Sequence, residues 1–109
     1  MIRITVSIDK NGEYKRIEFN GHALFAEYGT DIVCAAVSIL ALNTLNSIEI
    51  FCEDIISVEE DTENGLLAAE FKNKLSEKAK LLMDSLLLGL DGISKEYGKK
   101  YVTILRQEV

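Results

Sequence analysis

Hydrophobic and polar positions alternate over the first eight residues, where Ile2, Ile4, Val6 and Ile8 share one face. This period of two is typical of a half-buried β-strand. A turn sequence, Asp9-Lys10-Asn11-Gly12, follows this strand, and its Asn-Gly pair is a strong hairpin signal. Further strands are predicted where short apolar runs lie next to turn signals such as Asn64-Gly65, over residues 14–19, 55–60, 66–71 and 101–105.

Apolar residues recur at helical spacing in two longer stretches. The first helix is predicted from Asp31 to about Phe51, with a buried face made of Val33, Val37, Leu40, Ala41, Leu45 and Ile48. The polar residues in its second half are assigned to the solvent side, namely Asn43, Thr44, Asn46 and Ser47.

The second helix is predicted to open at Ser76 and to stop at Gly98. Its core stripe consists of Ala79, Leu82, Met83, Leu86 and Leu90. Three further leucines, at positions 81, 87 and 88, widen the apolar surface beyond one face. That excess favours either burial under a sheet or a dimer interface.

The predicted element order is ββαββαβ, which favours an α/β two-layer sandwich with a largely antiparallel sheet of about five strands and two helices. A chain of 109 residues suits one domain with a single core, spanning residues 1–109. The first residues lack a long apolar run, so we predict no signal peptide, no transmembrane helix and a cytoplasmic location.

The formal net charge of −6 opposes a broad nucleic-acid surface, which would need a basic stripe. The charge is compatible with a basic polypeptide partner, but it would also simply keep a small protein soluble. Charge therefore excludes one class of partner without choosing another.

The stretch from Asn20 to Ser38 holds the only histidine, His22, and one of two cysteines, Cys34. Thr30 or Asp31 is predicted to cap the first helix, which places Cys34 in its first turn. A helix N-terminus favours a thiolate over a thiol, so we expect a lowered Cys34 pKa. The backbone N–H groups of that turn, including that of Cys34, are candidate oxyanion donors.

A loop bracketed by Gly21 and Gly29 would bring His22 back over the helix start, as a base for the thiol. On residues alone, a cysteine on an alanine-rich helix face is more often a small buried hydrophobe than a nucleophile. The second cysteine, Cys52, lies about five helical turns further on and is interpreted as a core residue or a bystander.

Several residue types at matched spacing carry a family resemblance. Gly-His-Ala, a short glycine-containing loop, Asp-Ile-Val-Cys-Ala-Ala-Val-Ser and the segment Gly-Leu-Asp-Gly-Ile at 89–93 resemble the bacterial ribosomal-processing cysteine proteases of the Prp family. The resemblance covers the whole chain. It implies a homodimer without a cofactor that removes a short N-terminal extension, hydrophobic and aromatic near the cut, from a large-subunit ribosomal protein.

The catalytic residues would then be His22 and Cys34. Asp31 is a possible third member or a helix cap, and Ser38 either hydrogen-bonds near the site or back-bonds within the helix. The loop carries the apolar side chains of Leu24, Phe25 and Tyr28, which either pack inward or contact substrate as a gating flap hinged at its glycines.

Two other hypotheses compete with the protease. A non-enzymatic ribosome-associated binding module would use Cys34 and His22 only for packing. A zinc site would use His22, Cys34 and Asp31 as three ligands, although a cluster without a paired Cys-x-x-Cys is a poor metal signal. We therefore expect no metal.

Overall fold

The computed structural model describes residues 1–24 and 31–109. Its seven elements follow the predicted order ββαββαβ, and their bounds are β1 Ile2–Ile8, β2 Tyr14–Gly21, α1 Ile32–Phe51, β3 Ile56–Asp61, β4 Leu66–Phe71, α2 Glu77–Tyr97 and β5 Val102–Glu108. The predicted segments were correct in kind, and most of their ends lie within one or two residues of the observed ones. Strands β2 and β5 run two and three residues further than predicted.

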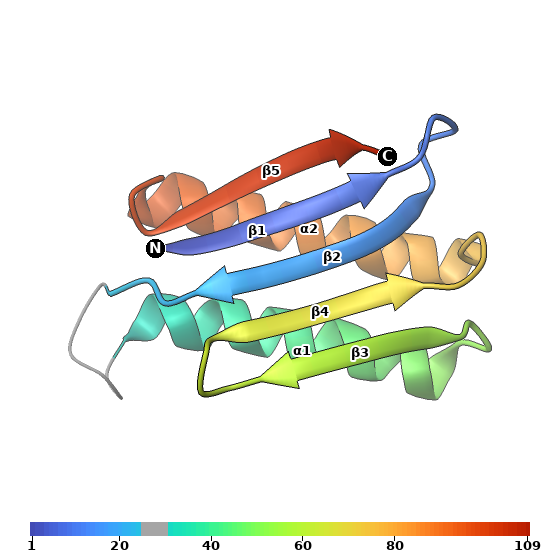
Figure 1. Cartoon of the computed structure of the whole chain (residues 1–109), viewed down its shortest axis with the longest axis horizontal. Coiled ribbons are helices and arrows are strands. Elements are labelled where there is room, and N and C mark those ends of the chain that lie inside the picture. Colours follow the sequence, from blue (N-terminus) through green and yellow to red (C-terminus); the bar gives the residue numbers. More distant parts are fainter. Residues whose placement is uncertain (25–30) are drawn as a thin grey trace.

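The five strands form one sheet in the order β3-β4-β2-β1-β5, with α1 and α2 side by side on one face (Figure 1). Three of the four strand pairs are antiparallel, and β5 pairs with β1 in parallel. The two-layer sandwich with a largely antiparallel sheet is therefore confirmed. The parallel pair arises because α2 crosses over between β4 and β5, which returns the chain in the direction of β1.

The core lies between the sheet and the helices. Ile4 and Ile17 from the sheet meet Ile48, Met83 and Leu90 from the helices, and all five side chains are at most 1% exposed. On the other face of the sheet, Arg16 forms ion pairs with Glu18 and Glu70. The sheet thus has one buried and one charged face, as period-two strands require.

One polar residue of α1 was misassigned. Thr44 is buried at 7% exposure, although we placed it on the solvent side with its polar neighbours. It lies one helical turn before Ile48 and three residues after Ala41, so helical geometry puts it on the buried face. A threonine hydroxyl is tolerated on a buried helix face because it can donate a hydrogen bond to a backbone carbonyl of the preceding turn, which a longer amide side chain does less readily.

Helix α1 is apolar and long enough, by length and composition alone, to cross a membrane, although we predicted no such segment. Its buried residues, among them Val33, Val37 and Leu45, belong to the hydrophobic core. A core helix passes the same test, so packing against the sheet accounts for this composition.

Candidate active site

His22 follows directly after the last residue of β2, at the end of the sheet where α1 begins. The preceding residue, Gly21, has φ +97° and pairs with Ile2 across the β1–β2 ladder. The Gly21 N–H donates to the carbonyl of Gly65, and the amino group of Met1 donates to the carbonyl of His22. The backbone on both sides of the exposed imidazole is therefore anchored to neighbouring strands.

Cys34 lies in the first turn of α1, as predicted. The cap is Asp31, whose Oδ1 accepts hydrogen bonds from the N–H groups of Val33 and Cys34 at 3.0 Å each. The Cys34 N–H, which we predicted as an oxyanion donor, donates to this cap in this structure, so its role as an oxyanion donor stays a prediction. The sequence could place backbone N–H donors at the helix start, but it could not show which of them donate to the cap.

A backbone contact joins the two candidate residues. The N–H of Ala23, the residue after His22, donates to Cys34 Sγ at 3.2 Å. Ala23 itself is buried at 2% exposure, so this contact is anchored in the core. Within residues 1–24 and 31–109, no hydrogen bond directly joins the imidazole of His22 to the sulfur.

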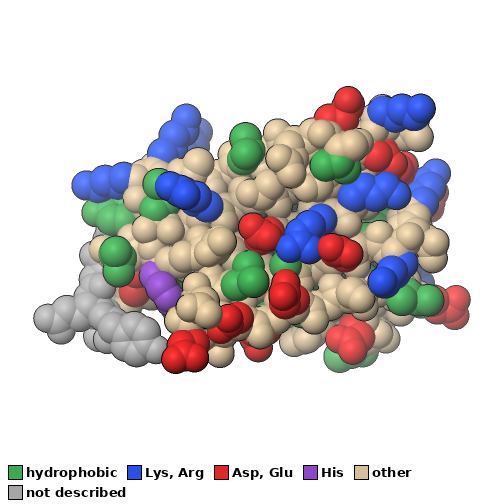
Figure 2. Space-filling view, in the orientation of Figure 1, with side chains coloured by type: hydrophobic (Ala, Val, Ile, Leu, Met, Phe, Trp, Pro, Cys, Tyr) green, Lys and Arg blue, Asp and Glu red, His purple; other side chains and the backbone are tan. Residues whose placement is uncertain are grey.

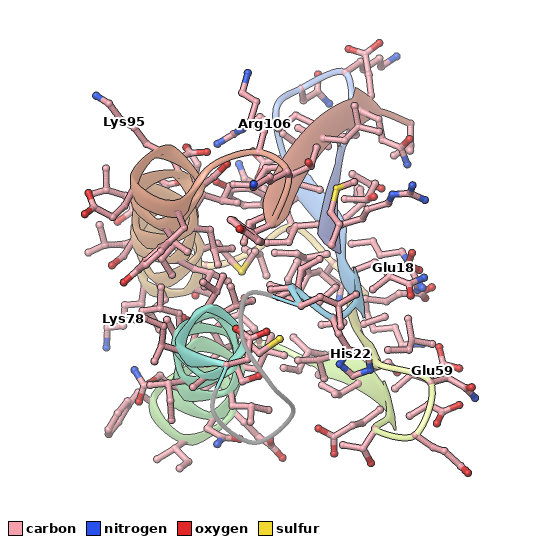
Figure 3. All side chains as sticks on the ribbon, turned by 90° about the vertical axis from the view of Figure 1, so that its left-hand side faces the viewer. Glu18, His22, Glu59, Lys78, Lys95 and Arg106 are labelled. Atoms are coloured by element: carbon pink, nitrogen blue, oxygen red, sulfur yellow. The ribbon has the colours of Figure 1, made fainter. Side chains whose placement is uncertain are left out.

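A pocket of about 160 Å³ holds both side chains. His22, Cys34 and Ser38 line it together with the backbone around Gly21, and apolar side chains of the sheet, including Phe19, Leu66 and Leu67, complete the wall. Figure 3 shows His22 beside the chain that links β3 to β4. A mostly apolar lining with a few polar groups is typical of ligand sites.

The pKa of Cys34 is shifted opposite to our expectation. Partial burial raises the pKa of the thiol most, and the Asp31 carboxylate raises it further through hydrogen bonding and charge. The backbone N–H groups of Ala23 and Leu24 act in the other direction and lower the pKa, but they do not outweigh burial. At neutral pH the resting group is therefore a thiol, which needs a base before it attacks.

We expect the Asp31→Asn variant to deprotonate Cys34 at lower pH than the wild type. Asparagine retains the helix cap, but it removes the negative charge that raises the pKa of the thiol. The measurement is the rate of iodoacetamide alkylation against pH, in a Cys52→Ala background so that one thiol reacts. An unchanged or upward-shifted midpoint would show that the charge of Asp31 does not act on the sulfur.

Of the three predicted substrate-contacting residues, only one is among the described residues. Leu24 is exposed beside the site and adopts a left-handed backbone, φ 56°. Phe25 and Tyr28 lie outside the described residues, as does most of the predicted gating loop. Among the described residues, no group of three His, Cys, Asp or Glu side chains is arranged to hold a metal ion, so the zinc ligand set is not assembled.

One residue of the site was missed. Gly65 lines the pocket and lies against the imidazole of His22, yet in the sequence it signalled only a hairpin turn. The pairing of β2 with β4 brings Gly65 there, and nothing local in the sequence indicates that pairing.

Comparisons with known proteins agree with this geometry. Residues 1–103 match the family described as "Cysteine protease Prp". The ribosomal processing cysteine protease Prp of Bacillus subtilis is 30% identical over 103 residues, covering 89% of this chain and 90% of its own. That of Mycoplasma pneumoniae is 40% identical over 70 residues, covering 64% and 61%.

Solved structures show the same fold. SMU.848 from Streptococcus mutans has a TM-score of 0.86 at 32% identity, over 100% of this chain and 96% of its own. The Staphylococcus aureus ribosomal processing protease Prp, in complex with a covalently linked product peptide, has a TM-score of 0.92 at 24% identity, over 97% and 99%.

These matches bear on the choice between a protease and a non-enzymatic binding module. The family and the curated relatives are named as proteases, which favours an enzyme over the non-enzymatic binding module. The matched residues 1–103 include every residue that lines the pocket. The chain belongs to the Prp family of cysteine proteases.

Proposed function

We propose that this protein removes a short N-terminal extension from a bacterial large-subunit ribosomal protein, with Cys34 as nucleophile and His22 as general base. The observation that carries the proposal is that both side chains line one pocket, with the Ala23 N–H linking the histidine segment to Cys34 Sγ. The curated relatives, named ribosomal processing proteases, support the substrate class.

The chemistry follows from a thiol with a raised pKa. His22 takes the proton from Cys34 Sγ, and the sulfur then forms a bond to the scissile carbonyl carbon, giving an acyl-enzyme as the peptide C–N bond breaks. The proton passes from the imidazole to the leaving amine, and His22 then activates the water that hydrolyses the thioester. The Ala23 N–H stabilises negative charge on the sulfur during the first step.

The surface around the pocket suits a basic substrate. Glu60 lines the pocket, and Figure 2 shows acidic side chains close to the histidine on this face. Together with the net charge of −6, this favours a basic polypeptide over nucleic acid. The exposed side chain of Leu24 is a candidate contact for an apolar residue of the extension.

The test is to incubate the purified protein with the extended ribosomal protein from the same source and weigh the products by mass spectrometry. A single cut near the N-terminus is expected. The matched control is the same ribosomal protein without its extension, which should stay intact. An uncut extended substrate would contradict the proposed specificity, and cutting at many sites would show a protease without it.

We further propose that the protein forms a homodimer in the cytoplasm through the outer face of its helix layer. Three large apolar side chains are exposed there, Ile39 of α1 at 69%, Leu81 at 69% and Leu88 at 76% of α2. Exposed apolar side chains gathered on one layer of a small domain often mark an interface.

Sedimentation equilibrium tests the dimer. The wild type is expected at twice the 12.2 kDa mass of the chain, and a Leu81→Glu/Leu88→Glu variant at the single mass, because burying two carboxylates across an interface is unfavourable. Ser57→Glu, on exposed strand β3, is the control and should remain dimeric. A monomeric wild type would refute the proposal.

A further inference from the structure

The imidazole of His22 lies against the backbone of Gly65, on the side of the Cα atom where any other residue carries its Cβ. A Cβ at Gly65 would lie 2.9 Å from His22 Nε2, 3.2 Å from His22 Cε1 and 3.2 Å from the carbonyl oxygen of Gly21. The first distance is shorter than real Cβ contacts allow. The imidazole therefore occupies space that only a glycine leaves open.

Gly65 is itself held firmly. It ends the turn between β3 and β4, and its N–H donates to the carbonyl of Thr62 while its carbonyl accepts from the N–H of Gly21. The start of this turn is fixed by Asp61, whose carboxylate accepts from the backbone and side-chain N–H groups of Asn64 at 3.2 and 2.7 Å. Those hydrogen bonds lower the pKa of Asp61, so the carboxylate stays ionised and both of its oxygens remain hydrogen-bond acceptors.

The same turn thus contacts the end of β2 and the residue after it: the Gly65 carbonyl accepts from the Gly21 N–H, and the Gly65 backbone lies against the His22 imidazole. We propose that Gly65 is a positioning residue for His22: it sets where the imidazole lies in the pocket shared with Cys34. This inference rests on the proposed role of His22 as the base, because only then does its position affect the reaction. An added methyl group displaces the imidazole, and small displacements of a catalytic group are costly.

The chain supplies a matched control for the substitution. Gly65 has φ +68°, so Gly65→Ala introduces backbone strain as well as a Cβ. Gly12, in the β1–β2 turn, has φ +79° and nothing within 4 Å of its added Cβ. Gly12→Ala therefore introduces similar strain far from the site, and the difference between the two variants reports the contacts of the added Cβ with the His22 imidazole and the Gly21 carbonyl.

The experiment measures kcat, KM and the imidazole C–H resonances of each variant. Because His22 is the only histidine, its resonances are assigned without ambiguity. We expect Gly65→Ala to shift these resonances, to lower kcat by about tenfold to hundredfold with little change in KM, and to alter the pH profile of kcat. Gly12→Ala should leave the resonances and kcat at the wild-type values.

A second variant separates the Cβ from the strain. Gly65→Asn tolerates the left-handed backbone better than alanine but still carries a Cβ, so it should impair kcat and shift the resonances like Gly65→Ala. It also serves if Gly65→Ala fails to fold. The inference is overturned if the resonances and kcat of a folded Gly65 variant match those of Gly12→Ala.

Failure of the proposed function gives a different result. If His22→Ala retains wild-type cleavage, His22 is not the base. The resonances of Gly65→Ala then still report whether Gly65 places the imidazole. If His22→Ala is inactive while Gly65→Ala cleaves normally with unshifted resonances, only the positioning role is wrong.

Discussion

Replacing Cys34 by alanine is expected to abolish cleavage of the extended ribosomal protein while leaving the fold intact. Cys34 is only partly buried, so losing its sulfur costs little packing. No other described thiol is close to the pocket, because Cys52 follows the last residue of α1 at the opposite end of that helix. The measurement is product formation by mass spectrometry, with circular dichroism to confirm folding and Cys52→Ala as the matched control.

Replacing His22 by alanine should lower kcat by about 10²-fold to 10⁴-fold, the usual contribution of a general base. Because the pKa of Cys34 is raised by burial and by Asp31, the variant has almost no thiolate at neutral pH. Its residual activity should therefore rise steadily as the pH is raised, because the fraction of Cys34 present as thiolate rises with pH. A His22→Ala variant with wild-type rate at pH 7 would contradict the dyad.

The sequence predicted those features of the fold that depend on local physics. Alternation at Ile2–Ile8, the Asn-Gly turn and the helix cap at Asp31 each specify a structure within a few residues, and all three are present. Helical spacing likewise identified the buried residues Val33 and Ile48. These signals require no knowledge of distant residues.

Features that depend on long-range pairing were not predictable in the same way. The parallel pairing of β5 with β1 and the contact of Gly65 with His22 follow from the strand order, which periodicity does not encode. The direction of the Cys34 pKa shift was also missed. Helix position favours the thiolate, but burial, which depends on tertiary packing, and the carboxylate of the Asp31 cap outweigh it.

A substitution at Gly21 should damage stability and catalysis together. Gly21 has φ +97°, which side-chain-bearing residues rarely adopt, and an added Cβ would overlap the backbone carbonyl of Met1. Alanine must therefore distort the β1–β2 pairing at Ile2 or displace the strand end that carries His22. We expect Gly21→Ala to lower the free energy of unfolding by about 1–3 kcal/mol and to reduce cleavage markedly.

Urea denaturation and cleavage assays, with Gly12→Ala as the matched control, distinguish the site from general strain. Gly12→Ala has open space around its Cβ, so it should lose only the cost of a left-handed alanine, about 1–2 kcal/mol, and keep its activity. If Gly21→Ala behaved like Gly12→Ala in both assays, the strand end would tolerate a side chain and the placement of His22 would not depend on Gly21. If Gly21→Ala instead lost cleavage while its free energy of unfolding matched that of Gly12→Ala, β2 would serve catalysis by fixing the backbone from which His22 extends.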